Sequence, residues 1–213
     1  HSKGGVVQII SAAEKGLEEH EMQGKIRSST EAFLAKKVVV CEGATEVGFL
    51  RGFDDYQVEH KKKDPFSFHG VALVSAGSGN KVKGLAKAFK SLCYDVSVLA
   101  DADAEDQFSA ADVAELVKLG VPVHVWSDNL SLEERAFQDL PWATVLLSVK
   151  FALGELGFPA YDQVRSKFLK ELDTDIGTWK ECPELRTAIG IAAKKAGWFK
   201  DTTRGDLWFK AIS

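Results

Sequence analysis

The stretch that decides the fold is KVVVCEGATE, at residues 37–46. Its first half is a short run of apolar, mostly β-branched residues, which is typical of a strand buried on both faces of a parallel sheet. Its second half is a turn that carries two acids, Glu42 and Glu46, and the apolar segment 47–50 behind it indicates the start of a helix. The stretch therefore predicts a buried strand, an acidic turn and a helix in succession.

Further apolar runs repeat this arrangement downstream. We predict strands near residues 37–41, 71–75, 95–100 and 121–126. Helical patterns over 83–92 and 110–119 lie between them, and this alternation favours a parallel sheet. After Asn129 the apolar residues recur with helical spacing up to Ala196. The sequence therefore predicts an α/β fold with an added helical subdomain.

The composition limits the classes of protein that fit. The chain has 213 residues, 45% hydrophobic and 27% charged, with a net charge of -4, so any site for a polyanion must be local. Residues 191–213, with five basic residues against two acids, form one such patch. The sequence contains no apolar run of membrane-spanning length and no signal peptide, and three scattered cysteines suit a reducing cytoplasm. A start at His1 without an initiator Met indicates a piece of a longer chain.

Acids follow three of the predicted strands. Glu42 comes after the first strand, Asp101 and Asp103 come after the third, and Asp128 comes after the fourth. The carboxyl ends of parallel strands meet at one edge of a sheet, and residues two apart on an extended chain share a face, so these acids can grip one ion. Between Lys90 and Lys118 the chain has seven acids and no lysine or arginine. Taken singly, each acid is better explained as a solvated loop residue or a helix N-cap than as a metal ligand. Taken together they predict an oxygen-ligand site for Mg²⁺ or Mn²⁺ rather than zinc.

A resemblance to a known family rests on these same residues. Residues 38–46 followed by 100–103 resemble a Toprim domain, the Mg²⁺-binding fold of topoisomerases, primases and certain nucleases. The strand-Glu-Gly-turn-Glu form is most similar to the OLD (overcoming lysogenisation defect) family of ATPase-coupled nucleases. Other segments resemble motifs of that family in the right order, namely residues 30–35, 79–80, 130–137 and 197–200. The helical insert carries none of the resemblance.

The resemblance implies a fold and an activity. The implied fold is a parallel-sheet Toprim (Rossmann-like) core with an inserted or appended helical subdomain. We accordingly divide the chain into a helical lead-in (1–35), a Toprim core (36–137), a helical subdomain (138–196) and a segment returning to the active site (197–213). The implied activity is that of a DNA endonuclease or nickase, a hydrolase of phosphodiesters that uses two divalent cations, Mg²⁺ or Mn²⁺, about 3.5–4 Å apart. The family's ATPase carries a GxxxxGK[ST] loop that this chain lacks, so an N-terminal ATPase domain of the same full-length chain is an implied partner beside DNA.

The resemblance also implies roles for individual residues. The implied metal ligands are Glu42, Glu46, Asp101, Asp103, Ser131 and Glu133. Glu42 is also implied as a general base, and Lys200 as the group that stabilises charge on the scissile phosphate. Glu134 has the same charge as Glu133, and the choice between them stays open. Ser131 is equally well explained as a plain N-cap, and Lys200 as a lysine that snorkels beside two aromatic residues.

Two other functions stay open at this point. The Asp101/Asp103 pair imitates the DxD motif of a haloacid-dehalogenase-like (HAD-like) phosphatase, although that family places its motif after the first strand and this chain after the third. A non-catalytic module that binds DNA or a partner through a metal-organised acidic face is the second alternative.

Overall fold

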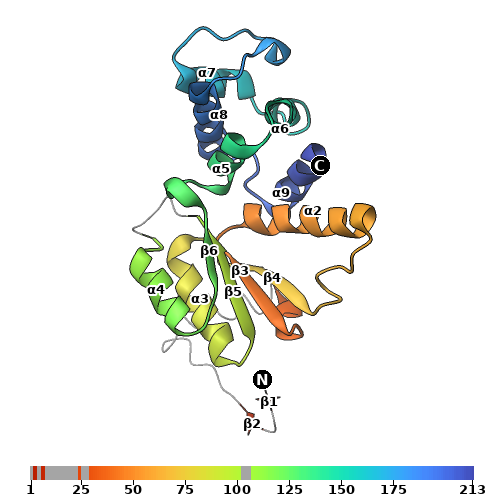
Figure 1. The fold of residues 1–213 in the computed structure, drawn as a ribbon, viewed down its shortest axis with the longest axis vertical. Helices are drawn as coiled ribbons and strands as arrows, with labels where there is room; N and C mark the ends of the chain where they lie inside the picture. The colour runs from red at the N-terminus through yellow and green to blue at the C-terminus, as the bar shows by residue number, and fades with distance from the viewer. Residues whose placement is uncertain (1, 4–5, 8–23, 25–28, 102–106) are drawn as a thin grey trace.

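The main sheet has four strands, and all of its neighbouring pairs are parallel. The computed structural model describes residues 2–3, 6–7, 24, 29–101 and 107–213 (Figure 1). The strands are β3 (Lys37–Cys41), β4 (Val71–Ser75), β5 (Asp95–Ala100) and β6 (Val123–Val125), in the spatial order β4-β3-β5-β6. The predicted α/β fold is confirmed, and the first strand pairs directly with the third, in the register Val38 to Val96. Residues 42 and 101 are thereby brought to one edge.

Helices cover both faces of this sheet. Helix α2 (Ala44–Lys61) lies on one face, and α3 (Gly79–Ser91) and α4 (Ala110–Lys118) lie on the other (Figure 1). Val38 and Val40 of β3 are fully buried in a core shared with α3, and this period of two is expected for strand residues that face one layer. The sheet and the layer of α3 and α4 thus form the first hydrophobic core, whereas Phe49 of α2 packs against the second.

A second core lies in the helical region. Its helices are α5 (Leu132–Asp139), α6 (Trp142–Gly154), α7 (Ala160–Phe168), η4 (Ile176–Thr178), α8 (Pro183–Ala196) and α9 (Thr202–Ile212). A short turn, η3 (Ser127–Asn129), leads into them. The buried residues of this core begin at Leu132, so α5 packs with the helical region, although the sequence groups it with the Toprim core. The four-part division of the chain stays a prediction.

Helix α9 returns from the helical region to the sheet and lies along α2 (Figure 1). Two glycines allow this approach: a Cβ on Gly205 would stand 2.6 Å from the carbonyl oxygen of Thr45, and a Cβ on Gly48 would overlap the carbonyl oxygen of Thr202. The hydroxyl of Thr45 also donates a hydrogen bond of 3.1 Å to the carbonyl of Phe199. The end of the chain is therefore joined to the start of α2 by close backbone contact.

The N-terminal prediction needs a correction. Spacing of apolar residues from Val6 onward predicts a helix, but β2 (Val6–Val7) pairs antiparallel with β1 (Ser2–Lys3). Adjacent valines are β-branched and favour extended backbone, and this local preference prevails there. Within residues 30–35 only a short 3₁₀ helix forms, η2 (Thr30–Phe33). The rest of the predicted lead-in lies outside the described residues, except for residue 24, which is helical.

The fourth strand is shorter than predicted, since β6 covers only Val123–Val125 of the predicted 121–126. Pro122 has no N–H to donate to a sheet, and Trp126 packs against the second core instead.

Nowhere in the described part of the chain is there a helix with the length and apolar character that a bilayer crossing requires.

Candidate active site

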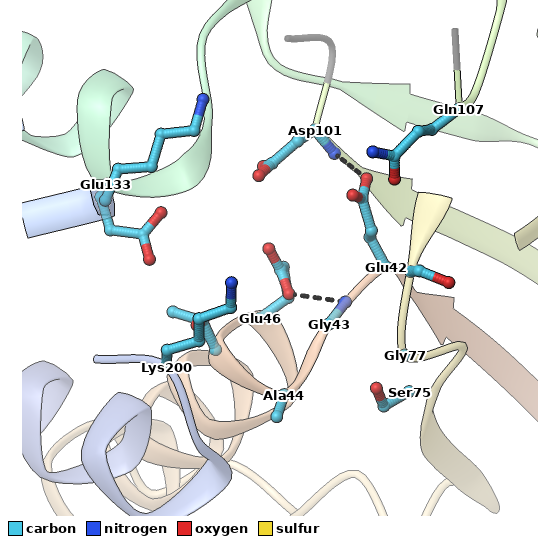
Figure 2. Close-up of a pocket in the computed structure, with 13 residues that line it drawn as sticks. Glu42, Gly43, Ala44, Glu46, Ser75, Gly77, Asp101, Gln107, Glu133 and Lys200 are labelled. Atoms are coloured by element: carbon cyan, nitrogen blue, oxygen red, sulfur yellow. Dashed lines mark hydrogen bonds between the residues drawn. The ribbon is translucent and has the colours of Figure 1, made fainter. Parts of the chain in front are cut away.

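A cavity of about 490 Å³ opens where the carboxyl ends of β3 and β5 meet the helical region. Figure 2 shows the carboxylates of Asp101, Glu46 and Glu133 and the amine of Lys200 pointing toward a common space. The cavity is lined by Glu42, Gly43, Ala44, Thr45, Glu46, Ser75, Gly77, Ser78, Asp101, Gln107, Glu133, Lys194 and Lys200. Five of the residues predicted for the site therefore surround one cavity: Glu42, Glu46, Asp101, Glu133 and Lys200.

The turn after β3 supplies two of the acids. Glu42 leaves the strand and accepts a hydrogen bond of 3.0 Å from the backbone N–H of Asp101 on the adjacent strand (Figure 2). Glu46, at the third position of α2, is 4% exposed and accepts a bond of 2.9 Å from the N–H of Gly43. A Cβ on Gly43 would stand only 3.0 Å from that carboxylate oxygen, so glycine leaves the space that Glu46 occupies. The Glu-Gly-turn-Glu sequence thus places both carboxylates on one side of the turn.

The two other acids come from β5 and α5. Asp101 follows β5 and accepts a hydrogen bond of 2.9 Å from the N–H of Leu132, at the first turn of α5. That bond joins the sheet to the helical region beside Glu133, which is 7% exposed and lines the cavity. Asp101 therefore connects the two parts of the molecule that share the site.

Ser131 is the N-cap residue of α5. Its hydroxyl accepts a bond of 3.3 Å from the N–H of Glu134, and the carboxylate of Glu134 accepts one of 3.1 Å from the N–H of Ser131. This reciprocal pair is a capping box at the start of α5. Of the two adjacent glutamates, Glu133 lines the cavity and Glu134 does not. Ser131 does not line it either, and a ligand role for Ser131 stays a prediction.

Lys200 reaches the cavity through a short, well-anchored connection. Gly197 ends α8 with a left-handed backbone, φ +65°, a conformation that glycine adopts without strain. Trp198 and Phe199 follow, fully buried in the second core, and Asp201 then caps α9 by accepting a bond of 2.7 Å from the N–H of Arg204. Lys200 is the exposed residue between these anchors, and its amine points toward the acids (Figure 2).

Burial raises the pKa of all four carboxylates, and repulsion from neighbouring acids adds to it for Glu42, Asp101 and Glu133. Burial raises the pKa of Asp101 to about 8, with a further contribution from the charges of Glu46, Glu133 and Glu42. Burial, with the charge of Glu46, raises the pKa of Glu133 to about 7. Burial is also the largest cause of the raised pKa values of Glu42 and Glu46. The site therefore holds more potential negative charge than it can keep without a compensating cation.

The substitution Asp101→Asn is expected to stabilise the cation-free protein near neutral pH. Asparagine keeps the oxygen that accepts from Leu132 and removes the charge that its neighbours repel. Because the pKa of Asp101 is higher in the folded protein than in the unfolded chain, its favourable contribution is complete below about pH 4 and is lost as the pH rises through about 8. The variant should have a flatter stability profile between those values, and a melting temperature higher by a few degrees, roughly 2–8 °C, at pH 8.

Thermal melts in EDTA across this pH range test the expectation. Asp95→Asn is a matched control, since Asp95 lies at the other end of β5, with its side chain 65% exposed. The control should keep the pH profile of the parent protein. A large loss of stability in Asp101→Asn would instead mark the acid as a structural residue.

The donor chemistry of the cavity fits a hard divalent cation. Four carboxylates face it, and none of the described residues that line it is a histidine or cysteine. Within the described ranges, no three Asp, Glu, His or Cys side chains stand close enough together to form a ready-made metal cage. The predicted ligand Asp103 lies in 102–106, outside the described residues. A cation would relieve the repulsion that raises these pKa values, and Glu42, Glu46, Asp101 and Glu133 are the residues that would hold it.

Several residues that line the cavity are not among the site residues predicted from the sequence. Lys194 belongs to the basic patch at 191–213, but its neighbour Lys195 gives an identical signal, and only the direction of α8 brings one of them to the cavity. Gln107 and Ser75 reach it from the segment after β5 and from the end of β4. A lone glutamine or serine in a loop carries no sequence signal that distinguishes it from any other.

Comparisons with known proteins bear on this site directly. Residues 33–103 match the family model described as "Overcoming lysogenization defect protein-like, TOPRIM domain". One similar solved structure is the C-terminal region of the Xanthomonas campestris pv. campestris OLD protein, with 14% identity, a TM-score of 0.43, and coverage of 85% of this chain and 92% of that one. Another is the C-terminal region of the Burkholderia pseudomallei OLD protein, with 16% identity, a TM-score of 0.46, and coverage of 81% and 87%. A search of curated proteins finds no match. The segment that matches this TOPRIM domain model, residues 33–103, contains Glu42, Glu46 and Asp101.

Proposed function

We propose that this chain is the nuclease part of a longer OLD-type protein and that it cleaves DNA phosphodiesters with Mg²⁺ or Mn²⁺, using two ions. The observation that carries the proposal is the cavity in which four carboxylates, from β3, α2, β5 and α5, face Lys194 and Lys200. Acids that hold a cation and lysines that bind phosphate are the two groups of residues that hydrolysis of a phosphodiester requires. The proposed partners are DNA and an N-terminal ATPase domain, and the proposed compartment is the cytoplasm.

Each residue has a role that its position supports. Divalent cations held by the four acids would supply charge neutralisation and a water of lowered pKa. Glu42 is proposed as the proton acceptor, because its raised pKa makes it a better base than an exposed glutamate and the N–H of Asp101 fixes one of its oxygens. Lys200 is proposed to meet the phosphate oxygen on which negative charge increases during displacement. Gly43 leaves room beside the turn for the carboxylate of Glu46.

The family match favours this function over the two alternatives. It covers the strand that ends in Glu42 and extends through the Asp-Ala-Asp segment after β5, so that segment belongs to a TOPRIM domain rather than to a haloacid-dehalogenase-like motif. The lysines favour catalysis over a purely structural metal site, because a site that only binds a cation gains nothing from two ammonium groups in the same cavity.

Cleavage assays on supercoiled and linear DNA, with Mg²⁺ or Mn²⁺, test the proposal. Glu42→Gln and Glu46→Gln are expected to lower the cleavage rate by a factor of about 100 or more, since each removes a charge from the cation site and Glu42→Gln also removes the base. Glu59→Gln is a matched control on α2, at its exposed end away from the cavity, and should cleave like the parent protein. Undiminished cleavage by Glu42→Gln would refute the proposed function.

A further inference from the structure

We propose that Lys194 is a second phosphate-binding residue of the cavity, which holds a DNA backbone phosphate beside the scissile one, and that Glu134 positions it. The inference rests on the proposed nuclease function and deepens it, because it assigns part of the substrate contact to the helical region. Sequence patterns give Lys194 and Lys195 the same role as general contacts in a basic patch. The structure separates them.

The position of Lys194 follows from how α8 packs. Helix α8 lies against α5, and the two backbones are close at Gly190, where an added Cβ would stand 3.0 Å from the Cα of Glu134. Lys194 comes one helical turn later on the same face and lines the cavity. Lys195 points away from this face and is exposed. Close helix packing therefore fixes which of the two lysines faces the acids.

An ion pair holds the Lys194 ammonium in place. Its Nζ lies 3.2 Å from the Oε2 of Glu134, and their side chains are 36% and 17% exposed. The same carboxylate is fixed on its own helix by the capping box with Ser131. Glu134 thus orients the lysine at the cavity that Lys200 also lines.

The charges around the cavity indicate the kind of ligand. Lys194 lines the same cavity as Glu42 and Asp101, so its positive charge stands beside two of the acids. Lys200 reaches the same cavity from the turn after α8. Once cations neutralise the acids, the two lysines remain as positive groups from adjacent segments of the chain. A ligand with more than one phosphate in sequence, such as a DNA strand, suits two such groups better than an isolated phosphate does.

Binding of a short fluorescent DNA duplex in Ca²⁺ over a series of salt concentrations tests this inference. Lys194→Ala should weaken binding by a factor of about 10 and lower the slope of log Kd against log salt by about 0.9, the value for one lost phosphate contact. Lys194→Arg should keep the slope. Lys195→Ala is the matched control and should leave both quantities close to those of the parent. Glu134→Gln should keep the slope but raise KM more than it lowers kcat, because the lysine is still charged and less well positioned.

Each result decides one question. Equal slopes for Lys194→Ala and Lys195→Ala, in a parent protein that binds and cleaves DNA, overturn this inference and leave the nuclease proposal intact. A parent protein that neither binds nor cleaves the duplex overturns both. Thermal melts identify any variant that fails to fold, and Lys194→Met, which keeps the apolar stem of the side chain, then replaces Lys194→Ala in the same comparison.

Discussion

Lys200→Ala is expected to lower the rate of DNA cleavage by a factor of about 100–1000 while leaving cation binding nearly unchanged. The residue lies far along the chain from Glu42, and the anchored turn after α8 brings its amine to the same cavity (Figure 2). An ammonium is not a metal ligand, so its loss should leave the affinity for Mn²⁺ intact. Its compact charge is proposed to meet the phosphate where negative charge increases, and the effect should therefore appear in kcat.

Single-turnover cleavage and calorimetric titration with Mn²⁺ measure the two quantities separately. Lys200→Arg should restore little activity, because a longer planar group places its charge elsewhere. Lys195→Ala is the control, because Lys195 belongs to the same basic patch, residues 191–213, but does not line the cavity. If Lys200→Ala weakens DNA binding and cleavage equally, and added salt reproduces the loss, Lys200 is an ordinary phosphate contact.

Gly205→Ala is expected to destabilise the protein by about 1–3 kcal/mol or more and to reduce cleavage as well. The added methyl group would stand 2.6 Å from the carbonyl oxygen of Thr45 and 3.1 Å from the amide nitrogen of Phe49, both of them backbone atoms of α2. Neither can move without shifting the helix that carries Glu46. The hydrogen bond from Thr45 to Phe199, next to Lys200, would be displaced at the same time. The added methyl group is therefore expected to displace both Glu46, on α2, and Lys200, beside Phe199.

Urea unfolding and the cleavage assay check this expectation together. Gly154→Ala is the control, because Gly154 is also a helical glycine, the last residue of α6, but a Cβ there meets nothing within 4 Å. That substitution should change stability by less than about 1 kcal/mol, in the favourable direction. A Gly205→Ala protein as stable as the parent would show that α2 and α9 separate readily.

The sheet was predictable because its signals are local. Three of the strands are short apolar runs. Two of these strands are followed by an acid, Glu42 or Asp101, and both acids line the cavity. The helix α8 begins and ends where its proline and glycine predict, at Pro183 and before Gly197. The local pattern predicts a fourth strand up to residue 126, but β6, at the edge of the sheet, ends at Val125. Trp126 packs against the second core instead.

The remaining parts of the site depend on contacts that no local pattern encodes. Lys194 and Lys195 are adjacent lysines in one helix, and the packing of Gly190 against Glu134 decides which one lines the cavity. Glu133 and Glu134 are likewise adjacent, and the capping box with Ser131 occupies one and leaves the other beside Asp101. In each pair the choice depends on helix rotation, which is set by tertiary packing between distant segments.

The order of the site residues along the chain has a consequence for biosynthesis. All four acids of the cavity belong to residues 42–133, whereas both lysines and the helix that packs on α2 come from the last stretch of this sequence. Because a chain folds from its N-terminal side as it leaves the ribosome, the acids emerge first and the lysines emerge last. A nascent chain that ends before α9 has the acids but cannot bring Lys200 to them through the contact of Gly205 with α2. Assembly of the candidate site is thereby delayed until this part of the polypeptide has been translated.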